Sequence, residues 1–245
     1  MGSDLSAAST MPELRSLHIW DNENVYDLLP LVGLPHFDTL AVGRNSVQDV
    51  SVLLQLPELR SLWLHQNLSE ADVDVLIQLT QLQSLSVGFE GGMDQGIFDR
   101  ITSHLTNLES FEYPFTPLDN INNIVHLQRL EVLDINHTNV TDLGPLFTTD
   151  GQLNNPGLRT LNIDLVPVPQ EQVDQLINLG VEIHGRVAGG VPIHELHFND
   201  AILEQCVREH LASAVTSGQL RHLNCSGRGV KDLSGIEQLN NLEEL

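Results

Sequence analysis

The chain has 245 residues, and its 11 Lys and Arg stand against 33 Asp and Glu, which gives a formal net charge of −22. Such a charge repels phosphate groups, so we expect neither nucleic acid nor an anionic membrane surface as a partner. No apolar run reaches the roughly 18 residues that a membrane span needs, and we expect no membrane insertion. Aromatic residues make up only 4% of the chain, so the core is expected to consist of aliphatic side chains in many small layers.

Residues 1–10 are expected to be a flexible tail, and an apolar pattern repeats along residues 11–184. Its first copy consists of Leu14, Leu17, Ile19 and Asn22, and the next two copies begin 23 and 22 residues later. The apolar members of the later copies are Phe37, Leu40, Val42; Leu59, Leu62, Leu64; Leu82, Leu85, Val87; Leu108, Phe111, Tyr113; Leu130, Leu133, Ile135; and Leu158, Leu161, Ile163. This spacing resembles the L-x-x-L-x-L-x-x-N pattern of leucine-rich repeats, in which each copy makes one short strand and one return segment.

The repeat predicts an α/β fold. Residues two apart in each copy point to the same side of a short strand, and one repeat cannot bury its apolar side alone. The copies must therefore stack into a curved parallel β-sheet, a solenoid of about seven repeats with a final edge strand at residues 181–184 and a helical or irregular convex side.

The last position of the pattern is expected to bond backbone groups in the turn that leaves each strand. The first three copies carry asparagine there, whereas the later copies carry other residues, so this ladder should be weaker in the second half of the solenoid. The asparagines are Asn22, Asn45 and Asn67, and their later equivalents are Glu90, Thr116, Thr138 and Val166.

Two return segments carry helix signals. Ser69 with Asp72 three residues later is typical of a capping box, and Pro169 opens a second amphipathic run that ends at Gly180. Glycine and proline around residues 91–93 and 150–157 indicate inserted loops.

A second unit is expected near the C-terminus. Residues 185–191 read as a glycine-rich linker, and residues 192–219 contain an amphipathic cap helix that begins at Asn199 or Asp200 and buries Ile202, Leu203 and Cys206. Residues 220–245 then restart the repeat at Leu220, Leu223 and Cys225, and the next copy begins at Leu242.

The segments FNDAILEQCV and LNCSGRGVKDLSGIEQLNNLEEL resemble the N-terminal cap and first repeat of bacterial internalin-like leucine-rich repeat proteins. The resemblance is close over about residues 192–245 and looser, through the repeat pattern, over residues 11–184. It implies a secreted or surface-attached binding protein whose partner contacts the concave face of the sheet.

Both ends of the chain would expose apolar layers, because no cap precedes the first copy and Leu245 lies within a strand. We therefore expect a fragment of a longer protein. The first residues lack a signal peptide, but in a fragment this does not argue against an extracellular or cell-surface location.

Cys206, on the cap helix, and Cys225, on the strand that this helix should cover, are positioned to meet. They form either a disulfide, which would imply an oxidising compartment, or two buried thiols. The internalin resemblance favours the disulfide.

No catalytic motif, cofactor loop or metal-ligand spacing is visible, so we expect neither an enzyme, a cofactor nor a metal. The candidate binding residues are instead the outward members of the strands. On the first strands these are aromatic, and small Ala41, Gly43, Ser86 and Gly88 beside them predict a shallow depression; tryptophan is enriched where interfaces hold their affinity. The other interpretation of the first tryptophan is that it packs beneath an absent cap. Further along, the same face becomes acidic. The candidates are His18, Trp20, Trp63, His65, Glu112, Asp134, Asn136, Asn162 and Asp164.

The sequence thus predicts a non-enzymatic module of a bacterial secreted or surface protein that binds another protein or a glycan through its concave sheet. The alternative is an intracellular effector whose repeats select substrates for a catalytic domain outside this chain. Nothing in the sequence indicates an oligomeric state.

Overall fold

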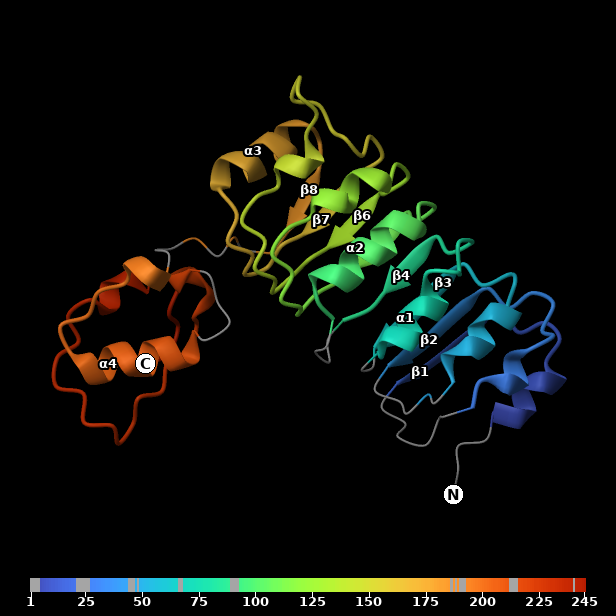
Figure 1. Ribbon diagram of the computed structural model, residues 1–245, viewed down its shortest axis with the longest axis horizontal. Coiled ribbons are helices and arrows are strands. Elements are labelled where there is room, and N and C mark those ends of the chain that lie inside the picture. The colour runs from blue at the N-terminus through green and yellow to red at the C-terminus, as the bar shows by residue number, and fades with distance from the viewer. Residues whose placement is uncertain are drawn as a thin grey trace.

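The computed structural model describes residues 5–245 except 21–26, 44–46, 48, 66–67, 89–92, 186, 188, 190–192, 212–215 and 240. Its main feature is an eight-stranded parallel sheet in which the spatial order of the strands is their order in the chain (Figure 1). The strands are β1 (Ser16–Trp20), β2 (Thr39–Gly43), β3 (Ser61–His65), β4 (Ser84–Ser86), β5 (Ser110–Glu112), β6 (Val132–Asp134), β7 (Thr160–Asn162) and β8 (Glu182–His184). The predicted α/β leucine-rich repeat solenoid is confirmed.

The predicted register is confirmed across the sheet. The inward residue of each strand pairs with its equivalent in the next, from Leu17 with Leu40 to Leu161 with Ile183. From β2 to β7 these inward side chains are fully buried, whereas those of β1 and β8 at the two edges are partly exposed. The core is therefore a line of aliphatic layers that each need a neighbour on both sides.

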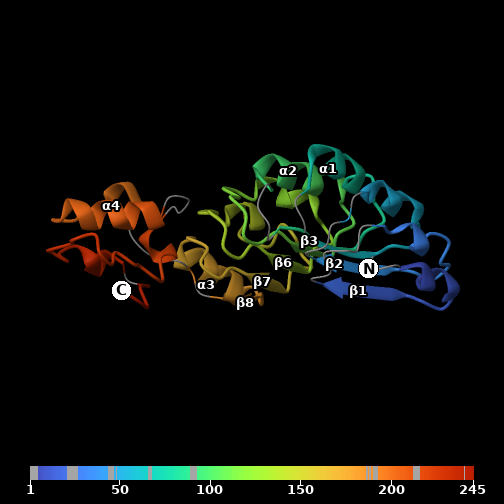
Figure 2. The same ribbon diagram turned by 90° about the horizontal axis from the view of Figure 1, so that it is seen from below.

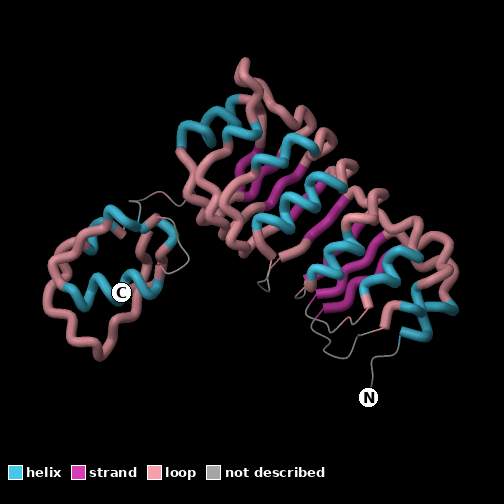
Figure 3. Tube along the Cα trace, viewed as in Figure 1, coloured by secondary structure: helices cyan, strands magenta, loops and turns pink. Residues whose placement is uncertain are grey.

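Return segments cover one face of the sheet (Figures 2 and 3). Three are α-helices, α1 (Glu70–Leu76), α2 (Gln95–His104) and α3 (Gln170–Asn178), and others are 3-10 turns, η2 (Leu29–Leu31), η3 (Val50–Gln55), η4 (Asn122–His126) and η5 (Gly144–Leu146). The predicted capping box at Ser69 and Asp72 is formed. Helix α2 was not predicted, although Asp94 caps it by accepting a hydrogen bond from the Ile97 amide.

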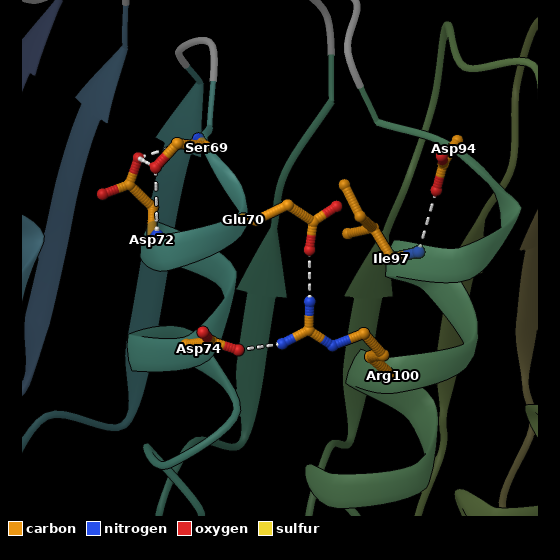
Figure 4. A network of polar contacts seen from close by, with 7 residues as sticks. All are labelled: Ser69, Glu70, Asp72, Asp74, Asp94, Ile97 and Arg100. Atoms are coloured by element: carbon orange, nitrogen blue, oxygen red, sulfur yellow. Dashed lines mark hydrogen bonds and ion pairs between the residues drawn. The ribbon is translucent and has the colours of Figure 1, made fainter.

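Neighbouring helices on this face are joined by an ion-pair network (Figure 4). Arg100 on α2 donates to Glu70 at 2.6 Å and also contacts Asp74, both on α1. The two carboxylates are well exposed, so this network contributes little to stability and mainly aligns the two helices.

The expectation of a flexible tail is wrong for its described part. Leu5–Thr10 form the 3-10 turn η1, in which Ala8 is buried and Leu5 packs against the core. The reason is that the first strand would otherwise leave its apolar layer open, and η1 covers part of it beside η2.

In two of the later turns that leave the strands, threonine side chains make the hydrogen bonds to backbone groups that the sequence assigned to asparagine in the first repeats. Thr116 and Thr138 are buried, and their hydroxyls donate to the carbonyls of Tyr113 at 3.1 Å and Ile135 at 2.8 Å. Threonine can therefore take this role in the later repeats, which the sequence interpretation undervalued. Asn22, Asn45, Asn67 and Glu90 lie outside the described residues.

A second hydrophobic cluster lies near the C-terminus. It contains helix α4 (Ala201–His210), and the 3-10 turns η6 (Ile193–Glu195), η7 (Ser217–Gln219) and η8 (Ile236–Gln238) lie around it. Asp200 caps α4 through the amides of Ile202 and Leu203. Leu203 and Cys206 are buried as predicted, but Ile202 is 40% exposed, so that part of the predicted face is wrong.

The repeat restarts in this second cluster. The amides of Glu243 and Glu244 both donate to the Arg221 carbonyl, as the amides of Asp38 and Thr39 donate to the Arg15 carbonyl in the first repeats. Within the described residues, no helix is long and apolar enough to cross a membrane.

Candidate functional site

The face of the sheet opposite the helices presents one outward residue from each strand in a continuous line. We call this line the central row. In strand order it consists of His18, Ala41, Trp63, Ser86, Glu112, Asp134, Asn162 and His184. The register therefore joins five of the predicted site residues, from the aromatic to the acidic end, into a single strip.

The aromatic end of the strip is formed by side chains of β1 and β3 that contact each other across β2. The ring centroids of His18 and Trp63 are 6.2 Å apart, and those of Trp20 and His65 are 5.1 Å apart. Trp20 is 42% exposed, so it points outward in the structure. Trp63 is partly exposed between its neighbours.

The prediction of a shallow depression beside the aromatic residues is wrong. Ala41 is only 1% exposed, and a Cβ atom added to Gly43 would lie 2.0 Å from the Trp20 ring. The small residues of β2 provide the space into which the rings of β1 and β3 lean. The Trp20 ring therefore fills the space beside Gly43, and Ala41 is covered.

His65 is not a surface contact residue, contrary to the sequence prediction. It is 9% exposed, and its Nε2 lies 2.7 Å from the hydroxyl of Ser86, which is fully buried. Burial lowers the pKa of His65 to about 4, so the imidazole is neutral near pH 7. Its ring packs against that of Trp20, with the centroids 5.1 Å apart.

The acidic end is formed by partly buried carboxylates. Burial raises the pKa of Glu112, an effect that a hydrogen bond with Ser86 opposes and the nearby Asp134 charge reinforces. Burial also raises the pKa of Asp134, although the Asn136 amide donates to its carboxylate at 2.9 Å and the Asn162 side chain at 3.1 Å.

Beyond the central row, Asp164 forms an ion pair with Arg221, a residue of the second cluster. Arg221 Nη2 lies 3.2 Å from Asp164 Oδ1, and Asp164 is linked to the strip because its amide donates to the Asn136 side chain. The sequence interpretation missed Arg221, which has no distinguishing motif. It also missed the role of Ser86, which contacts both His65 and Glu112 and so connects the two ends.

The site contains a serine and a histidine within hydrogen-bonding distance, but the pair is unsuited to nucleophilic chemistry. The Ser86 side chain is fully buried, so a substrate could not reach its oxygen. Among the described residues, no group of three or more His, Cys, Asp or Glu side chains is arranged to hold a metal ion.

Comparison with known proteins supports the fold. No protein-family model and no curated protein sequence matches the chain. Among solved structures, an internalin (inlF) from Listeria monocytogenes is 22% identical, with a TM-score of 0.52 over 75% of this chain and 59% of its own length. An internalin C2 (inlC2) from the same species is 22% identical, with a TM-score of 0.51 over 72% and 74% of the two chains.

A leucine-rich repeat protein from Leptospira interrogans is also similar, with 19% identity and a TM-score of 0.51 over 73% of this chain and 50% of its own. The chain thus spans 59% and 50% of the length of the inlF and Leptospira proteins. At these identities the likeness concerns the fold, and the chain has an internalin-like leucine-rich repeat fold.

Proposed function

We propose that this chain is a non-enzymatic binding module of a bacterial secreted or surface protein, and that it recognises a protein or glycan through the exposed face of its sheet. The observation that carries the proposal is the central row, where partly exposed aromatic rings adjoin partly buried carboxylates. Interfaces concentrate their affinity on such aromatic anchors. The Ser86 and His65 pair is buried, so it does not offer a reacting group that a substrate can reach.

The disulfide between Cys206 and Cys225 supports an extracellular location. The structure joins these residues with α-carbons 6.0 Å apart, within the separation that a disulfide requires. Disulfides persist in oxidising compartments, so this feature favours export over the intracellular effector that the sequence also allowed.

The test is a screen of the purified chain against a glycan array and a panel of extracellular protein domains, followed by affinity measurements on two variants. Trp63→Ala removes the ring at the centre of the aromatic surface. Ile177→Ala is the matched control, because Ile177 is a 53% exposed apolar residue on α3, which lies on the opposite face. We expect Trp63→Ala to weaken binding by roughly 30-fold, as expected for an interface hot spot, and Ile177→Ala to leave it unchanged. Ligands that all bind Trp63→Ala as well as the original chain would refute a site on this face.

A further inference from the structure

We propose that the acidic half of the central row, with Asp164 beside it, is a receptor for an arginine-bearing protein segment that lies across the strands and places an apolar side chain against Trp63. This inference rests on the proposed function and names the partner's chemistry. Its acidic members are Glu112, Asp134 and Asp164.

The first argument is charge complementarity. The eight residues of the central row include two carboxylates and neither lysine nor arginine. The chain as a whole has a formal charge of −22, so a cationic partner is attracted from a distance as well as at contact. Burial raises the pKa values of Glu112 and Asp134, which means that their charges are incompletely compensated and that a cation placed beside them offsets a desolvation cost.

The second argument is that a guanidinium already occupies the end of this surface. Arg221 Nη2 lies 3.2 Å from one Asp164 oxygen and 3.5 Å from the other, and its side chain is only 22% exposed. Arg221 comes from the second cluster, 57 residues further along the chain. The surface therefore accepts a guanidinium that approaches from outside the sheet, and Arg221 is an internal example of the ligand.

The third argument concerns arginine over lysine. The Asp134 carboxylate accepts hydrogen bonds from Asn136 and Asn162, so its position on the sheet is fixed. A fixed carboxylate suits a guanidinium, whose donors are held in a rigid planar fork, better than it suits a point charge on a flexible stem.

The spacing of the strip fits an extended segment. Strands in a sheet lie roughly 4.8 Å apart, which places Glu112 on β5 roughly 10 Å and Asp134 on β6 roughly 14 Å from Trp63 on β3. In an extended peptide, residues i and i+4 point to the same side and lie about 13 Å apart. An apolar residue followed four positions later by arginine therefore matches both ends of the strip.

The test uses three synthetic peptides that carry leucine and, four positions later, arginine, lysine or citrulline. Citrulline keeps the shape of arginine without its charge.

Binding is measured by fluorescence anisotropy at physiological salt with the original chain and with Glu112→Gln/Asp134→Asn. The control Glu13→Gln/Glu171→Gln removes the same charge from exposed positions outside the strip. We expect the arginine peptide to bind about ten-fold more tightly than the citrulline peptide and to lose about ten-fold on the strip variant, with less than two-fold change on the control.

In a second pair of variants, we expect the arginine peptide to bind more tightly instead of more weakly. Arg221→Gln removes one cation from Asp164 and should strengthen binding of the arginine peptide by about two- to five-fold. Arg129→Gln makes an equal change of charge at an exposed position outside the strip and should leave binding nearly unchanged. Equal binding of the arginine and citrulline peptides, or equal losses on the strip and control variants, would overturn the inference. A neutral oligosaccharide that binds through Trp63 without dependence on Glu112 and Asp134 would also overturn it while leaving the proposed function intact.

Discussion

Single residues on the sheet face show how this protein combines exposed rings with buried polar support. The His65 ring packs against Trp20 and lies beside Ser86, and burial lowers the pKa of His65 to about 4. An unfolded imidazole titrates near 6.5, so between these values the unfolded chain binds a proton that the folded chain does not. The free energy of unfolding therefore falls as the pH falls through this window.

This gives the first prediction for stability. When the pH falls from 7 to 5, we expect His65 to lower the free energy of unfolding of the original chain by about 2 kcal/mol. The His65→Gln variant should lack this loss. Denaturant unfolding of both proteins at the two pH values measures it. Glu112 and Asp134 have raised pKa values, so their protonation increases the free energy of unfolding as the pH falls. Because both proteins contain these two groups, the difference between their pH profiles isolates the effect of His65. Parallel pH profiles would show that His65 titrates freely.

A second prediction at this scale concerns Gly43. A Cβ atom there would lie 2.0 Å from the Trp20 ring, so Gly43→Ala must displace that ring from its position beside residue 43. Because Trp20 is 42% exposed, the ring can rotate into solvent, and we expect a loss of only about 1 kcal/mol together with a red shift of tryptophan emission. Gly189→Ala, with no atom within 4 Å of the added Cβ, is the control. An unchanged spectrum for Gly43→Ala would contradict the packing described.

The sequence pattern correctly selected the outward residues because alternation along a strand fixes the side on which each side chain lies. It did not show that Ala41 and Gly43 are covered, since this depends on the directions in which Trp20 and Trp63 lean between neighbouring strands. Nor could it show Arg221 beside Asp164, because that contact joins residues far apart in the chain.

At the scale of elements, strands were easier to predict than the segments that connect them. Each strand must bury the same apolar positions, so its register is strongly constrained, whereas the return segments need only cover the layer beneath them. Helix α2 and the turns η2 to η5 therefore differ from repeat to repeat. Asn155 illustrates this freedom: it is buried in an inserted loop and donates to the carbonyls of Ile124 and Leu127.

The adjacent residues Leu62 and Trp63 allow the strand register to be tested directly. Leu62 is fully buried between neighbouring repeats, so Leu62→Ala should leave a cavity and reduce the free energy of unfolding by about 2 to 5 kcal/mol. Trp63→Ala removes a larger side chain from the outward side and should cost clearly less. Thermal or denaturant unfolding compares the two variants. A larger loss for Trp63→Ala would mean that the inward and outward sides have been reversed.

At the scale of the whole molecule, the described residues form two hydrophobic clusters of very different size. The larger one runs through the sheet from β1 to β8, whereas the smaller one has eight buried residues around α4 among those that the structure describes. A small core supplies little stability by itself, and covalent staples are a common remedy. The second cluster contains the disulfide between Cys206 and Cys225, which the internalin resemblance favoured at the level of sequence.

The two clusters should therefore respond differently to loss of the disulfide. The bond joins residues separated by 19 positions, so its removal should destabilise the second cluster by about 3 kcal/mol through the entropy of the closed loop. In the double variant Cys206→Ser/Cys225→Ser we expect faster hydrogen exchange for the amides of α4, while exchange in β2 to β7 stays unchanged because those strands bury separate layers. Leu62→Ala provides the reciprocal control, since it should affect the sheet and spare α4. Thiol titration of the original chain, denatured without reductant, should detect no thiols; two reactive thiols would remove both the staple and the structural argument for an oxidising compartment.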